Sequence, residues 1–81
     1  MSRDDIVAKV NDFLIDEFEL EAGQLVPHAL MKEDLDIESL DFVDIAVIIE
    51  RDFGLKVTSE QMIKIKKLED LYEFILEHSK N

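Results

Sequence analysis

Apolar residues near the start of the chain recur at three- and four-residue spacing, which is the spacing of one face of an α-helix. The set consists of Ile6, Val10, Phe13, Leu14 and Phe18. Ser2 and Asp5 precede it with a weak variant of the capping box that begins many helices. The pattern predicts an amphipathic helix over residues 3–19.

Residues 20–38 follow no single period, and Gly23 and Pro27 interrupt them. We expect a loop whose apolar side chains pack on the helices; these side chains are Leu25, Val26, Leu30 and Leu35. A loop of this length in a small domain is often functional.

A second helix is predicted over residues 39–52, with Gly54 as its end. Its apolar positions cover a wide arc, so we expect it to be the most buried helix. The inward set is Leu40, Val43, Ala46, Val47, Ile49 and Phe53, and the exposed set is Asp41, Asp44, Ile48 and Arg51.

Two further helices complete the predicted fold. Thr58 and Gln61 form a capping-box pattern that opens a short helix over residues 59–65. The last helix, over residues 68–79, turns Leu68, Leu71, Tyr72, Ile75 and Leu76 inward. With only 2 glycines and 1 proline, the chain has too few turn-forming residues for the many turns of an all-β fold. Residues 1–81 are therefore expected to form one all-α domain, a four-helix bundle with three longer helices, one short helix and a long first loop.

The net charge of the chain limits the kinds of molecule that it can bind. The net charge is −11, and residues 1–53 carry all of it, with 15 acidic against 4 basic residues. Such a surface repels nucleic-acid phosphates and anionic lipid headgroups, so we expect neither nucleic acid nor membranes as partners. Basic patches on other proteins are the expected partners.

Other features of composition concern location. The beginning of the chain is polar and acidic, unlike a signal peptide. The longest apolar run, Ile45–Ile49, is too short to span a bilayer. We therefore expect a cytoplasmic protein. The absence of cysteine excludes a disulfide framework and a thiolate zinc site.

The residues that could do chemistry do not form an enzyme-like pattern. His28 and His78 are interpreted as ordinary surface residues, and there is no cysteine nucleophile or Gly-rich phosphate loop. Asp34, Asp36 and Glu38 have the first spacings of a calcium-binding EF-hand. That reading fails, because Ser39 stands where the loop needs glycine and Ile45 where it needs glutamate, although loose binding of divalent ions stays open.

Ser39 lies at the start of the second predicted helix, among acidic residues. These carboxylates disfavour the alkoxide that an attacking serine would need, which argues against a catalytic nucleophile. A serine in this position is most often an N-cap, and acids in the first turn are favoured by the helix dipole. From its position in the sequence alone, Ser39 is therefore interpreted as the N-cap of the second predicted helix.

The stretch EDLDIESLDFVDIAVIIERDFG (33–54) resembles the acyl carrier proteins. Their characteristic segment is D-L-G-x-D-S-L, followed by an acid and a helix of apolar and acidic residues that ends in an aromatic. The positions that match in register are Asp34, Leu35, Ser39, Leu40, Asp41, Val43, Asp44, Glu50 and Phe53. IKIKKLEDLYEFI (63–75) is similar to the family's final helix, so the resemblance covers essentially the whole chain.

The resemblance implies a four-helix bundle and a function. Ser39 would be the attachment point of 4′-phosphopantetheine, transferred from coenzyme A by a phosphopantetheinyl transferase. The arm would carry acyl groups as thioesters to acyl-transferring and ketosynthase-type enzymes of fatty-acid, polyketide or related biosynthesis. The protein would be a monomeric carrier and not an enzyme.

The resemblance also implies residue roles. The partner-recognition set is Asp36, Glu38, Leu40, Asp41, Asp44, Ile48 and Glu50. The candidate acyl-chain pocket is Phe42, Ala46, Ile49, Ile63 and Ile75, for which plain core packing is an equal alternative.

Three departures from the family pattern indicate a specialised carrier. Asp36 replaces the usual glycine, Glu38 replaces the usual aspartate before the serine, and Arg51 replaces a frequent acid, with Ile48 expected as an exposed apolar residue beside it. Two alternatives stay open: an unmodified acidic helical adaptor for basic protein partners, and a D-alanyl or peptidyl carrier.

Overall fold

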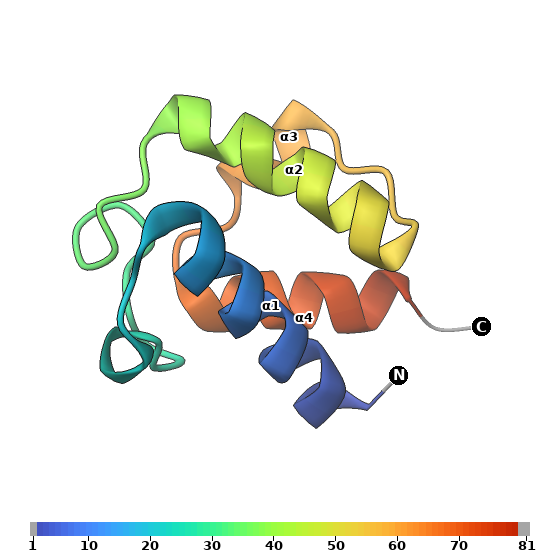
Figure 1. Ribbon diagram of the computed structural model, residues 1–81. Coiled ribbons are helices and arrows are strands. Elements are labelled where there is room, and N and C mark those ends of the chain that lie inside the picture. Colours follow the sequence, from blue (N-terminus) through green and yellow to red (C-terminus); the bar gives the residue numbers. More distant parts are fainter. Residues whose placement is uncertain (1, 80–81) are drawn as a thin grey trace.

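The computed structural model describes residues 2–79, which form four α-helices and one short 3₁₀-helix (Figure 1). The elements are α1 (Arg3–Phe18), η1 (Ala22–Gln24), α2 (Ser39–Phe53), α3 (Ser59–Ile63) and α4 (Leu68–His78). The predicted all-α architecture is confirmed. Each predicted end lies within two residues of the observed one.

Two helices begin with the capping boxes that their sequences predict. At α1, the Asp5 amide donates to Ser2 Oγ at 3.2 Å, and the Ser2 amide donates to Asp5 Oδ2 at 3.4 Å. At α3, the Gln61 amide donates to Thr58 Oγ1 at 3.2 Å, and the Thr58 amide to Gln61 Oε1 at 2.9 Å. These bonds satisfy amides that have no partner inside the helix, which fixes both starting points.

The helices pair as α1 with α4 and α2 with α3, and α2 crosses above the first pair in Figure 1. The long loop between α1 and α2 is attached to the start of α4. The Leu68 amide donates to the Ala29 carbonyl and the Glu69 amide to the Pro27 carbonyl, both at 2.9 Å. The loop therefore forms a fixed part of the bundle.

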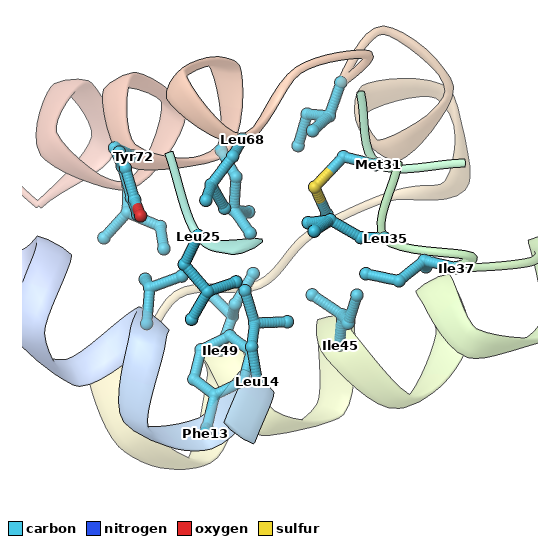
Figure 2. Close-up of a cluster of buried hydrophobic side chains, with 14 of the residues drawn as sticks. Phe13, Leu14, Leu25, Met31, Leu35, Ile37, Ile45, Ile49, Leu68 and Tyr72 are labelled. Atoms are coloured by element: carbon cyan, nitrogen blue, oxygen red, sulfur yellow. The ribbon is translucent and has the colours of Figure 1, made fainter. Parts of the chain in front are cut away.

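The core lies between the helices and is closed on one side by the loop (Figure 2). Leu25 and Leu35 of the loop are buried as expected, whereas Val26 is exposed and Leu30 is half-buried. Ala29, Met31 and Ile37 join the core from the same loop, which makes it a larger contributor than its sequence indicates.

The orientation of α2 differs from the prediction. Leu40, Val43 and Val47, which were expected inside, expose 80%, 60% and 60% of their surface. Ile48, which was expected outside, is buried at 4% exposure. The buried stripe of α2 is Ile45, Ile48 and Ile49, flanked by the half-buried Phe42, Ala46 and Phe53. This helix has two apolar stripes, and the bundle buries the isoleucine one.

Tyr72 links α4 to α1 at the edge of the core. Its hydroxyl donates to the side-chain carbonyl of Asn11, and the Arg3 guanidinium lies 5.8 Å from the centre of its ring. Burial raises the pKa of the Tyr72 phenol, against the opposing effects of Asn11 and Arg3.

Candidate functional site

Ser39 is the first residue of α2, and its side chain is exposed. The N-cap is Glu38, so the interpretation of Ser39 as the cap is wrong. The cap is closed from within the helix, where Asp41 Oδ2 accepts the Glu38 amide at 2.9 Å. Because Asp41 takes this role, the Ser39 hydroxyl is not needed to begin the helix.

The chain reaches Ser39 through a turn at Asp36. Asp36 has a φ of 55°, in the left-handed region that favours glycine, where the family pattern has its glycine. Directly after it, Ile37 is fully buried and its amide donates to the Met31 carbonyl at 2.9 Å. The buried Ile37 anchors the loop, so Ser39, two residues later, is presented at the surface on a fixed base.

The acidic residues of the predicted recognition set precede Ser39 in the loop and follow it along α2. Asp36, Glu38, Asp44 and Glu50 are exposed, and Asp41 is half-buried beside the cap that it forms. Ile48 is buried in the core, so the exposed apolar residue expected at this position is wrong. The flank of α2 that carries Asp41 and Asp44 is therefore negative.

An exposed apolar stripe runs along α2 from the residue next to Ser39. It consists of Leu40, Val43 and Val47, and Ile63 of α3 adds a fourth exposed side chain at 67% exposure. Val43 and Val47 were missed as surface residues by the sequence reasoning. The available signal was their spacing, because Val43 follows Leu40 by three residues and Val47 follows Val43 by four, which marks a second apolar face of the helix.

A surface groove of about 810 Å³ lies between α2 and α3 and reaches Ser39. We call it the α2–α3 groove. Its lining is Leu30, Met31, Lys32, Glu33, Ser39, Phe42, Val43, Ala46, Val47, Glu50, Val57, Thr58, Ser59, Met62, Ile63, Ile65 and Lys66. Its volume is in the range of small-molecule sites, which are mostly apolar with a few polar groups.

The groove brings together part of the predicted acyl-chain pocket. Phe42 and Ala46 from α2 and Ile63 from α3 line it. Ile49 and Ile75 do not, because both are fully buried in the core. The open groove thus contains three of the five predicted residues.

Arg51 lies outside the groove, at the far end of the exposed face of α2. Its Nε is 3.0 Å from Asp52 Oδ1, and this hydrogen bond raises the pKa of the guanidinium. One positive charge therefore interrupts the acids of this helix, as the sequence predicts.

Other kinds of site have little support in the part of the chain that the structure describes. Within residues 2–79, no group of three or more His, Cys, Asp or Glu side chains is arranged to hold a metal ion. Asp34 Oδ2 accepts the Leu30 amide at 2.8 Å, which is a turn contact. His78 stacks on Phe74, with its Nδ1 2.9 Å from the Phe74 carbonyl oxygen, and His28 is exposed in the loop. Over the same residues, no helix is long and apolar enough to cross a membrane.

Comparison with known proteins places these features in a family. The family described as "Phosphopantetheine attachment site" matches residues 8–75. The acyl carrier protein of Rubrobacter xylanophilus is 30% identical over 78 residues, which is 96% of each chain. The acyl carrier protein of Thermosynechococcus vestitus is 32% identical over 75 residues, 93% of each chain. That of Phytoplasma mali is 32% identical over 76 residues, 94% of this chain and 90% of its own.

The residues present suit a covalent phosphopantetheine group. An exposed primary hydroxyl stands at a fixed helix start, outside the capping bonds, and a mostly apolar groove begins beside it. A long, flexible attached arm could extend into solvent or along this groove.

Proposed function

The chain belongs to the phosphopantetheine-attachment family of the acyl carrier proteins, and we propose that Ser39 bears its 4′-phosphopantetheine arm. The protein is a carrier and not a catalyst, and 4′-phosphopantetheine is its cofactor. The observation that carries the assignment of Ser39 is its exposure at the first position of α2, with Asp41 closing the cap in its place.

The attachment needs chemistry that the chain does not supply. The Ser39 oxygen forms a bond to the phosphorus that bears pantetheine, and the phosphorus–oxygen bond to the leaving phosphate of coenzyme A breaks. Adenosine 3′,5′-bisphosphate leaves, and the hydroxyl proton goes to a base on the phosphopantetheinyl transferase. The acids around Ser39 do not have to activate it, because the serine is a substrate in this step. Their contribution is to attract the basic surface of the transferase.

The same face supports the proposed partners. We propose that the transferase, and later acyl-transferring and ketosynthase-type enzymes, contact α2 through basic patches that face Glu38 and Asp44. The exposed Leu40, Val43 and Val47 would supply the apolar centre of these contacts. Attraction of this kind raises on-rates while it leaves affinity modest, which suits a monomeric, cytoplasmic carrier that must leave each partner.

The pathway proposed is a dedicated one, in fatty-acid, polyketide or related biosynthesis. Its support is the set of departures around Ser39. Asp36 keeps the left-handed backbone of the family's glycine, but adds a charge. Glu38 is longer than the family's usual aspartate, and Arg51 places a positive charge near the end of α2 where the family often has an acid.

Intact-mass measurement tests the attachment. The protein is incubated with coenzyme A and a broad-specificity transferase, and separately with the host's own transferase. We expect a gain of one phosphopantetheine, which Ser39→Ala abolishes. Ser59→Ala is the matched control, because Ser59 is also the exposed first residue of a helix and also lines the groove.

Two outcomes would contradict the proposal. A gain that persists in Ser39→Ala would place the arm elsewhere. No gain with any transferase would favour the unmodified acidic adaptor. A D-alanyl or peptidyl carrier would show the same mass gain, and the enzyme that loads its thiol would distinguish it.

A further inference from the structure

The two ends of the α2–α3 groove carry different charges. Lys32, Glu33 and Lys66 line the groove from segments that backbone hydrogen bonds connect to the approach to Ser39. Two backbone bonds fix this placement: the Met31 amide donates to the Lys66 carbonyl, and the Ile37 amide to the Met31 carbonyl, both at 2.9 Å. The segments that carry both lysines are thus tied directly to the segment that leads into Ser39.

The other end of the groove is reached eleven residues further along α2, about 16 Å along the helix axis. Glu50 lines it there, together with Val57 and the hydroxyls of Thr58 and Ser59. The charge along the groove therefore changes from basic near Ser39 to acidic near Glu50.

The lysine end contrasts with its surroundings. Residues 1–53 contain 4 basic residues against 15 acidic ones, and Lys32 is one of the four. Asp41 and Asp44 do not line the groove, because they lie on the opposite flank of α2. An anion attached to Ser39 is consequently repelled from the acidic flank and attracted to the groove side.

We infer that Lys32 and Lys66 hold the phosphodiester of the arm on Ser39 and so seat the arm in the α2–α3 groove. The inference rests on the proposed attachment at Ser39. Beyond the lysines, the arm follows the apolar wall of Val43, Val47 and Ile63. A cargo that reaches the far end meets Glu50, so this resting position suits uncharged acyl groups and disfavours those that end in a carboxylate.

Amide chemical shifts of the apo and holo proteins test the inference. We expect holo-minus-apo differences at Val47 and Val57, which line the groove beyond the first turn of α2. In the double variant Lys32→Gln/Lys66→Gln, these distant differences should be lost, while those next to Ser39 remain. Salt should weaken them in the unsubstituted protein, since the screening length falls from about 10 Å at 0.1 M to about 3 Å at 1 M ionic strength.

Lys56→Gln/Lys64→Gln is the matched control, because both lysines are exposed and neither lines the groove. It has the same change of charge and should keep the distant differences. Lys32→Arg/Lys66→Arg should restore them, because the positive charges return.

Three results would overturn the inference. The first is that the chemical-shift differences of the unsubstituted holoprotein are confined to the neighbours of Ser39. The second is that the distant shift differences survive in Lys32→Gln/Lys66→Gln. The third is that Lys56→Gln/Lys64→Gln loses the distant shift differences to the same extent. If the intact mass shows that Ser39 takes no arm, both the proposed function and this inference fall. A loaded arm without contact in the groove removes only the inference.

Discussion

Val47 and Ile48 are neighbours in α2, and substituting each of them tests which face of this helix is buried. Ile48 exposes 4% of its surface and Val47 exposes 60%. Ile48→Val removes one buried carbon and should lower the free energy of unfolding by about 0.5–1.5 kcal/mol, and Ile48→Ala by about 2–5 kcal/mol. Val47→Ala loses little burial and should change it by no more than about 0.5 kcal/mol.

Urea unfolding followed by circular dichroism measures these differences at one fixed salt concentration. With a slope of about 1 kcal/mol per M for a chain of this size, Ile48→Val should lower the midpoint by about 0.5–1.5 M. Ile48→Val is the informative variant, because Ile48→Ala could remove most of the stability of a small domain. A midpoint unchanged in Ile48→Val, or lowered as far by Val47→Ala, would refute the assigned orientation.

Three further predictions concern other contacts. Burial raises the pKa of the Tyr72 phenol, so the folded state keeps this proton to a higher pH than the unfolded state does. The stability of the fold should therefore fall as the pH rises above about 10. Thermal melts should show a smaller fall in Tyr72→Phe, which has no phenol to titrate. Asp41→Ala removes the acceptor of the Glu38 amide and should lower the free energy of unfolding by about 0.5–1 kcal/mol, measured as a lower urea midpoint. An unchanged midpoint would contradict the role of Asp41 in the cap. Asp36→Gly should preserve or raise the melting temperature, because φ at this position is 55° and glycine adopts such an angle without strain. Asp36→Val should lower the free energy of unfolding by about 1–2 kcal/mol. Equal melting temperatures for the two variants would contradict strain at this position.

The helices were predictable because their determinants are local. The three- and four-residue period of α1 and α4 and the capping residues Ser2 and Thr58 all act within a few positions of one another. The resemblance to the acyl carrier proteins placed Asp36 at the family's glycine position, and its φ of 55° agrees with that position. Local information of this kind survives in a single sequence.

The orientation of α2 could not be read in the same way. Leu40, Val43 and Val47 form one stripe with helical spacing, and Ile45, Ile48 and Ile49 form another. Both fit the period of a helix, so the choice depends on what α1, α4 and the loop present to α2. The groove has the same limitation, because separate segments of the chain line it and only the fold brings them together.

The exposed stripe on α2 also connects charge with function. An apolar strip on a small protein invites self-association, and such strips usually mark interaction sites. Here Glu38, Asp44 and Glu50 surround it, so two copies of the chain repel each other where their strips would meet. A partner with basic residues around an apolar centre meets no such repulsion. The acids therefore have two effects on the same surface: they keep other copies of the chain away from the strip, and they favour partners with basic residues around an apolar centre.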